Sequence, residues 1–181
     1  MTVMIGESIV IASYLDKLDQ VRVTTTSPDN TVAASWTARN GIRVTLGSGA
    51  ISLHNEQTLA REVAAAAYSA QIGFRRACGS PRPDTVDEPR ARQHAEALAT
   101  VDASCVSPGG YVTARVRHDE RFDISIRPGT LSTRVPVDLL TAELNAAIAA
   151  TIRSHRLKST EIARRQRRRT AATGRAARRS L

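Results

Sequence analysis

A pattern of apolar residues that occurs twice, 80 residues apart, constrains the fold more than any other feature of this sequence. The passage SPDNTVAASWTARNGIRVTL begins at Ser27, and SPGGYVTARVRHDERFDISI begins at Ser107. The two passages have few identical residues, but they share the order of apolar residues and glycines. The paired positions include Val32 with Val112, Val44 with Ile124, Leu46 with Ile126 and Gly49 with Gly129. Such order predicts that one structural unit is present twice.

The correspondence extends to both sides of these passages. Upstream, Leu18 pairs with Leu98, and downstream a one-residue insertion changes the offset to 81. With that offset Leu59 pairs with Leu140, and the same offset pairs Glu62 with Glu143. Chance similarity is the alternative explanation, but it accounts poorly for five successive segments that match in order.

Each unit has the same predicted elements, in the order α-β-β-β-α. Short helices are expected over 13–20 and 92–101; in the first copy Ile11, Leu15 and Leu18 recur at helical spacing. Alternating strands are expected over 21–25, 32–38 and 42–46, and again over 101–105, 112–118 and 122–126. Long helices follow, one capped by Asn55 and one with Pro136 in its first turn. The expected fold class is α+β, with one buried face on each sheet.

The domain boundaries follow from the repeat and from a segment rich in proline. We expect a first module over 6–77, a linker over 78–89, a second module over 90–160 and an Arg-rich tail over 161–181. The linker is assigned from CGSPRPDTVDEPR, which holds three prolines. Glu7 interrupts the apolar stretch near the N-terminus, and no basic segment precedes it. This stretch is therefore expected to belong to the fold and not to act as a signal peptide.

The positive charge is concentrated at the C-terminus. The chain has a net charge of +9, and residues 153–181 hold eleven Lys and Arg against one acid, Glu161. Two conformations remain open for the tail, an extension of the last helix or disorder, and Gly174 is expected to end any helix there. The candidate phosphate-binding residues are Arg164, Arg165, Arg167, Arg168, Arg169, Arg175, Arg178 and Arg179.

The residue types that carry catalysis or bind metals occur without the spacing that these functions require. The four histidines are scattered, and His118 falls in a predicted turn. We therefore expect no enzymatic activity, no cofactor and no metal. Cys78 and Cys105 are interpreted as free thiols, with a bridge between them as the alternative. Trp36 is expected to pack in the core or between modules, with stacking on a nucleic-acid base as the alternative.

Two motifs, each present in both units, resemble the YbaB/EbfC family of small nucleoid-associated proteins of bacteria. The first is Ser-Pro followed by Asp29 or Gly109, ahead of an apolar strand. The second is Leu-x-x-Glu followed by an apolar residue, at 59–63 and 140–144. The resemblance covers about residues 10–77 and 90–157. Members of this family are homodimers of one-module chains with tweezer-like arms, so two tandem modules imply an intramolecular pseudo-dimer.

The resemblance and the tail together favour one function and leave a second open. The first is a cytoplasmic, nucleoid-associated protein that binds the DNA backbone electrostatically, without reading sequence. The second is a protein-binding accessory or chaperone factor of type VII (ESX) secretion, because similar modules form parts of such accessory proteins. No membrane span is expected, since no apolar run approaches about 20 residues. Further oligomerisation remains open.

Overall fold

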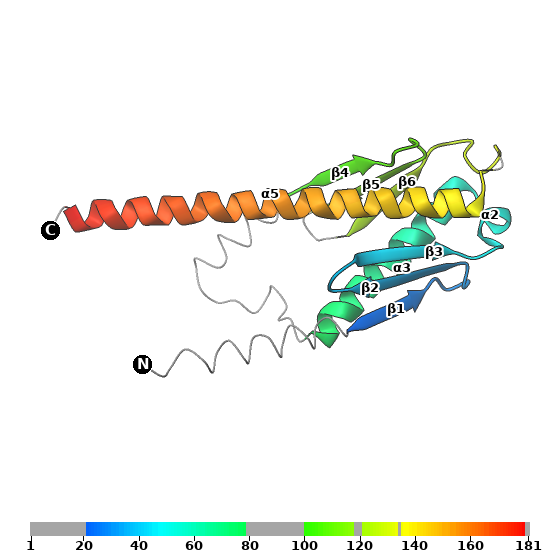
Figure 1. Ribbon diagram of the computed structural model, residues 1–181, viewed down its shortest axis with the longest axis horizontal. Helices are drawn as coiled ribbons and strands as arrows, with labels where there is room; N and C mark the ends of the chain where they lie inside the picture. Colours follow the sequence, from blue (N-terminus) through cyan, green and yellow to red (C-terminus); the bar gives the residue numbers. More distant parts are fainter. Residues whose placement is uncertain (1–20, 79–99, 118–120, 134, 180–181) are drawn as a thin grey trace.

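The computed structural model describes residues 21–78, 100–117, 121–133 and 135–179, with side chains described as far as Arg165. The short helix expected over 13–20, the linker after Cys78 and the turn at His118 lie outside the described residues. So does the helix expected over 92–101, except for its last two residues, Thr100 and Val101, which are not helical. The elements, shown in Figure 1, are β1 (Arg22–Thr26), β2 (Val32–Thr37), β3 (Gly41–Leu46), α2 (Ala50–Leu53), α3 (Glu56–Ala77), β4 (Ala103–Val106), β5 (Val112–Val116), β6 (Phe122–Ile126) and α5 (Val137–Arg179).

The strands form two separate antiparallel sheets with the orders β1-β2-β3 and β4-β5-β6. Corresponding residues hold the same register, because Val32 pairs with Leu46 in one sheet and Val112 pairs with Ile126 in the other. Alternate residues are buried on β3, β5 and β6, which confirms the predicted one-sided burial there, whereas β1 has no buried residue. Strand β4 begins two residues later than predicted, although Val101 is buried. The fold class is therefore α+β, as the alternation of residues predicted.

The two Ser-Pro turns are held by the same hydrogen bonds. The Ser27 amide donates to the Val32 carbonyl at 2.8 Å, and the Val32 amide donates to the Ser27 hydroxyl at 3.0 Å. Ser107 and Val112 repeat both bonds, at 2.8 and 3.1 Å. Each turn also places one residue in the left-handed region, at Asn30 (φ 58°) and Gly110 (φ 70°), which asparagine and glycine tolerate best. The repeated sequence thus produces repeated local structure.

Helix α3 begins as predicted. The Asn55 side chain accepts a hydrogen bond from the Thr58 amide, and the Thr58 hydroxyl accepts one from the Asn55 amide. This reciprocal capping satisfies two amides that a helix start otherwise leaves unpaired. Between β3 and α3 the chain forms a turn at Gly47 and then the single helical turn of α2, which was not predicted.

Helix α5 differs from the prediction at both ends. Its first residue is Val137, and the Pro136 carbonyl accepts a bond from the Leu140 amide, so Pro136 lies just before the helix and not in its first turn. The prediction that Gly174 ends the helix is wrong, because α5 continues to Arg179. Apart from Thr173, the three residues on either side of this glycine are alanine or arginine, strong helix formers that offset its cost of about 1 kcal/mol.

Each long helix packs on its own sheet and on the third strand of the other sheet. Helix α3 covers β1 and β2 and reaches β6, whereas α5 covers β4 and β5 and reaches β3 (Figure 1). Threonine hydroxyls at matching interfaces bond to backbone carbonyls, Thr25 to Ala66 at 2.9 Å and Thr151 to Ala114 at 3.0 Å. The fully buried side chains on the two helices include Leu59, Val63, Leu140, Leu144 and Ile148.

Asn145 and Glu56 each bond directly from one half of the chain to the backbone of the other. The Asn145 amide group accepts from the Val44 N–H and donates to the Val44 C=O, each at 2.8 Å. The Glu56 carboxylate accepts from the Leu131 N–H at 3.1 Å. Val44 lies on β3, an edge strand of the first sheet, so Asn145 on α5 closes part of an edge that a further strand could otherwise occupy.

Two remaining expectations concern cysteines and membranes. Cys78 at the end of α3 and Cys105 on β4 are free thiols, each half-buried. Among the helices that the structure describes, none combines the length and the apolar character that crossing a membrane requires.

Candidate nucleic-acid interface

Helix α5 is the element that carries the candidate phosphate-binding residues. It has 43 residues, which corresponds to a length of about 65 Å. Of the side chains described on it, Thr151 is the last that is buried. The C-terminal part of the helix therefore extends beyond both sheets, as Figure 1 shows. The first of the two conformations considered for the tail, an extension of the last helix, is the one observed.

Two of the eight candidate arginines have described side chains. Arg164 is exposed, and Arg165 forms an exposed ion pair with Glu161 one helical turn earlier, with Nε 2.9 Å from Oε1. The other six belong to the α5 backbone, and their side chains lie outside the described residues. The helical repeat places positions 164, 168, 175 and 179 within about 60° of one line along α5.

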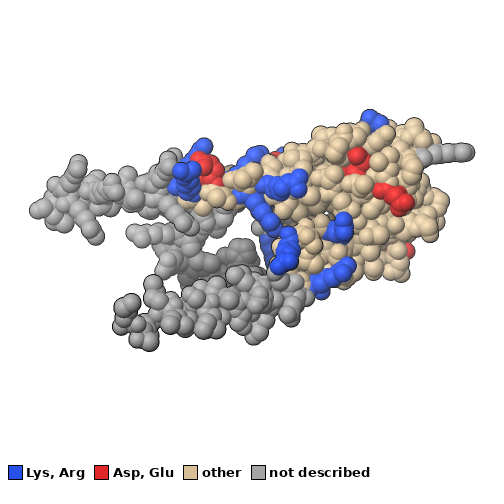
Figure 2. Space-filling model, in the orientation of Figure 1, with Lys and Arg blue, Asp and Glu red and all other residues tan. Residues whose placement is uncertain are grey.

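Further cations, which the sequence reasoning missed, lie on the body near the root of this extension. The last turn of α3 holds Arg75 and Arg76, and α5 holds Arg153 and Arg156, both exposed. In the view of Figure 2, Lys and Arg atoms gather where α5 begins to leave the body. The repeat offers a signal that could have identified two of these residues, because an offset of 81 pairs Arg75 with Arg156.

Trp36 lines one hollow with Arg75 and Arg156 and packs against the core. Its ring stacks on that of Phe74, with centroids 5.8 Å apart and planes 29° from parallel. Of its two interpretations, packing is therefore the one observed. Tyr68 lies on α3, like Phe74, and the guanidinium of Arg121 lies over its ring, 5.7 Å from the centroid. This is a cation–π contact between the two halves of the chain.

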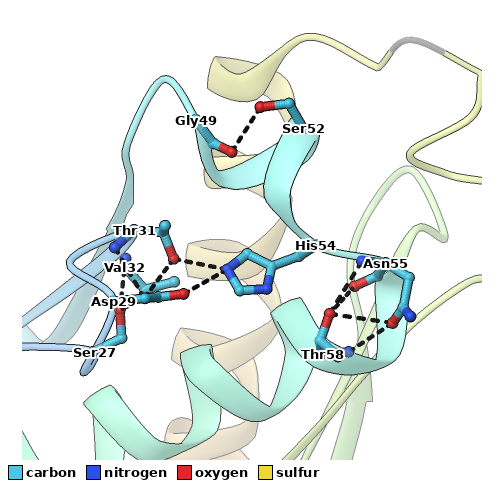
Figure 3. Close-up of polar contacts among 9 residues, drawn as sticks. All are labelled: Ser27, Asp29, Thr31, Val32, Gly49, Ser52, His54, Asn55 and Thr58. Atoms are coloured by element: carbon cyan, nitrogen blue, oxygen red, sulfur yellow. Dashed lines mark hydrogen bonds and ion pairs between the residues drawn. The ribbon is translucent and has the colours of Figure 1, made fainter.

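A polar cluster at the first Ser-Pro turn is a second group of interacting side chains (Figure 3). The Asp29 carboxylate accepts from the Ser27 hydroxyl at 2.6 Å, from the Thr31 amide at 3.1 Å and from the Thr31 hydroxyl at 2.8 Å. His54, which follows α2, brings its Nε2 atom within 2.8 Å of Asp29 Oδ2 and 2.9 Å of Thr31 Oγ1. The cluster thus ties the segment after α2 to the turn between β1 and β2.

The geometry of this cluster differs from that of a proton relay. In a relay the carboxylate and the hydroxyl bond to opposite nitrogens of the imidazole ring. Here both oxygens contact the same nitrogen of His54. A proton on Nε2 can serve both acceptors, so the contacts are those of a structural clamp. The histidine side chain is 11% exposed, which agrees with that role.

The corresponding turn between β4 and β5 is held in another way. Gly109 occupies the position of Asp29, and its amide donates to both oxygens of Glu143 on α5, at 3.1 and 2.9 Å. A Cβ atom at Gly109 would lie 2.8 Å from the Tyr111 ring and 2.9 Å from Glu143 Oε2. A side chain at this position would therefore displace the carboxylate that holds the turn.

We expect the clamp to make stability depend on pH. Hydrogen bonds from Ser27 and from Thr31 hold the pKa of Asp29 well below its usual value of 3.8. Because the folded pKa is depressed, the contribution is complete above about pH 4 and is lost as the pH falls further. Chemical denaturation of the natural chain and of Asp29→Asn should show the variant less stable at neutral pH. The difference should shrink below about pH 4, and a difference independent of pH would contradict this role.

Comparison with family models, with curated proteins and with solved structures gave no match to this chain.

Proposed function

We propose that this protein is a non-enzymatic, nucleoid-type DNA-binding protein that grips the phosphate backbone without reading base sequence. The observation that carries the proposal is the extension of α5, which projects a segment with eight arginines and no acid beyond both sheets. A projecting cationic helix can approach a duplex without hindrance from the body. DNA presents about one charge per 1.7 Å of axis, so a helix segment of this kind can contact several phosphates.

The chemistry of the segment favours backbone contact over base readout. Arginine guanidinium groups bond phosphate oxygens through two parallel N–H donors. Residues 164–181 contain no aromatic residue that could stack on a base. The exposed cations Arg76 at the end of α3 and Arg153 on α5 add to the positive surface of the body. Binding is therefore tolerant of sequence and sensitive to salt.

The body is proposed to be an intramolecular pseudo-dimer of two YbaB-like modules. The exchange of contacts supports this, since α3 reaches β6 of the other half and α5 reaches β3 of the first. The shared turns at Ser27 and Ser107 support it as well. In this proposal one chain supplies the two-fold surface that two separate subunits supply in the family. Linkage keeps the halves at a high effective concentration, about millimolar or more.

Salt dependence tests the electrostatic mechanism. We expect the logarithm of the affinity for duplex DNA to fall linearly with the logarithm of salt concentration, by about 0.9 per phosphate contacted. A slope between about −3.6 and −7.2 is expected if between four and eight of the arginines each contact one phosphate. Fluorescence anisotropy on two duplexes of unrelated sequence should give the same slope and affinities within about threefold. A shallow slope, or strong preference for one duplex, would contradict the mechanism.

A protein partner of the secretion type is the second candidate, and one observation favours it. Leu157 on α5 is 73% exposed and borders an open hollow with Val101 and Ile162, which an apolar partner could cover. A pull-down from native lysate with and without nuclease separates the two proposals. Nuclease-sensitive recovery of DNA supports the first, whereas a protein retained after nuclease treatment supports the second.

A further inference from the structure

Strand β6 is an edge strand of the second sheet, and its backbone directs polar groups away from that sheet. In an antiparallel pair, residues that bond to the neighbouring strand alternate with residues whose N–H and C=O point away from it. The Arg127 amide donates to the Tyr111 carbonyl at 2.8 Å, so Arg127 belongs to the first class. Ile124 lies three positions earlier and belongs to the second, as does its counterpart Val44, whose N–H and C=O bond to Asn145.

The two corresponding edges differ in the side chain that faces them. Helix α3 packs on β6 as α5 packs on β3, and at an offset of 81 Ala64 on α3 corresponds to Asn145 on α5. Alanine has neither a donor nor an acceptor in its side chain, and no other side chain of the described residues bonds to the Ile124 backbone. The β6 edge therefore keeps an N–H and a C=O that can pair with an added strand.

An open hollow of about 500 Å³ lies along this edge. One wall is formed by strand residues 123–126, and the other by the start of α3, where Gln57, Ala60 and Arg61 line it. Side chains alternate between the two faces of a sheet, so four successive residues line one hollow through the strand edge. The hollow thus gives a partner access to the backbone of Ile124.

The charged residues that line the hollow differ in their partners. Asp123 Oδ2 lies 3.0 Å from Nη2 of Arg117, and the Glu56 carboxylate accepts from the Leu131 amide at 3.1 Å. Arg61 is exposed, and within the described part of the chain no carboxylate pairs with it. An acidic residue in the occupant would complement this guanidinium group.

We propose that the β6 edge binds an extended, acidic peptide segment of a partner protein, which adds as a strand and places a carboxylate near Arg61. The peptide backbone makes at Ile124 the bonds that Asn145 makes at β3, and Ala60 and Ile126 offer an apolar surface to its side chains. A second copy of the chain fits less well. The one acid on β6 is Asp123, and because Arg117 already pairs with it, β6 of a second copy would leave Arg61 without a partner.

The site is separate from the proposed DNA-binding segment, since Arg164 and the residues after it do not line the hollow. The probe is a fluorescent peptide, acetyl-VTVEVTV-amide, in which valines occupy one face and a central glutamate the other. Nuclease-treated full-length protein at about 0.15 M salt should bind it saturably, with a dissociation constant of about 10 μM to 1 mM by anisotropy.

Two altered peptides identify the contacts. Methylation of every backbone nitrogen removes the donors that pair with a strand edge, so this peptide should show no saturable binding. Glutamine in place of the glutamate should weaken binding by about two- to fivefold, because an exposed ion pair contributes little.

Three variants localise the binding. Ala64→Asn places on α3 the side chain that closes the β3 edge from α5, and it should weaken peptide binding by about tenfold or more. Ala65→Asn makes the same change at the next, exposed position and should bind within about twofold of the natural chain. Arg61→Gln should lower the affinity for the glutamate peptide to that for the glutamine peptide.

Unchanged binding by Ala64→Asn would overturn the proposal, because the peptide would then lie elsewhere, for example on the arginine-rich segment. Saturable binding of the methylated peptide, or none of the glutamate peptide up to about 1 mM, would overturn it too. If thermal melting shows that Ala64→Asn does not fold, the methylated peptide and Arg61→Gln decide. In sedimentation, a monomer that stays monomeric with peptide bound supports the proposal. A dimer that the peptide dissociates would assign the edge to a second copy and overturn it.

Discussion

Deletion of residues 164–181 is expected to lower the affinity for duplex DNA by about a hundredfold or more at roughly 0.1 M salt. The deletion removes eight arginines from a chain of net charge +9 and leaves +1. Each phosphate contact releases bound counterions, and this release favours binding. Loss of one contact therefore removes a contribution of about 0.9 logarithmic units of affinity between 0.1 and 1 M salt. A gel shift or anisotropy titration measures the loss.

Full-length variants separate charge from length. Replacement of the eight arginines by lysine keeps the charge and should retain affinity within about tenfold, whereas replacement by glutamine keeps helix propensity and should reproduce the deletion. The melting temperature should change little on deletion, because Thr151 is the last buried residue described on α5. Retention of the natural affinity by the glutamine variant would refute the role of the tail.

Substitution Asn145→Ala is expected to lower the free energy of unfolding by about 2 kcal/mol. The side chain satisfies both the N–H and the C=O of Val44, each at 2.8 Å, and Val44 is 1% exposed. Alanine leaves both backbone groups without this partner, and a buried unpaired polar group costs about 1–3 kcal/mol. Partial access of water at the half-buried Asn145 and the better helix propensity of alanine reduce the total.

Two further variants identify the cause of that loss. Asn145→Asp keeps an acceptor for the Val44 amide but places a charged oxygen near the Val44 carbonyl, so it should destabilise at least as much as alanine. Asn40→Ala changes an exposed asparagine and should stay within about 0.5 kcal/mol. Chemical denaturation measures all three variants. Equal stability of Asn145→Ala and Asn40→Ala would show that the contact between the halves contributes nothing.

Local structure followed closely from the sequence, because local rules determine it. Alternation at Val32, Ala34 and Val44 placed strands within one or two residues of their observed bounds. Asn55 marked the start of α3 because an asparagine followed by a threonine three residues later is a capping signal. The repeat itself predicted that the two sheets would share strand order and register.

Such local rules do not predict contacts between residues that are far apart in the sequence. Asn145 reads as an ordinary polar helix residue, and only the packing of α5 on β3 brings it to Val44, 101 positions earlier. His54 reads as an isolated histidine until α2 directs it toward Asp29. The prediction that the helix ends at Gly174 was wrong because it used the low helix propensity of this one glycine and not the high helix propensity of the alanines and arginines near it.

The exchange of helices between the halves has a consequence for biosynthesis. A ribosome releases β1, β2, β3 and α3 well before α5, so the β3 edge that Asn145 closes stays open while the second half is translated. An open edge and an uncovered apolar face invite association between nascent chains. At an elongation rate of about 5–20 residues per second, this exposed interval lasts several seconds. Premature termination before α5 should therefore yield fragments that aggregate or are degraded.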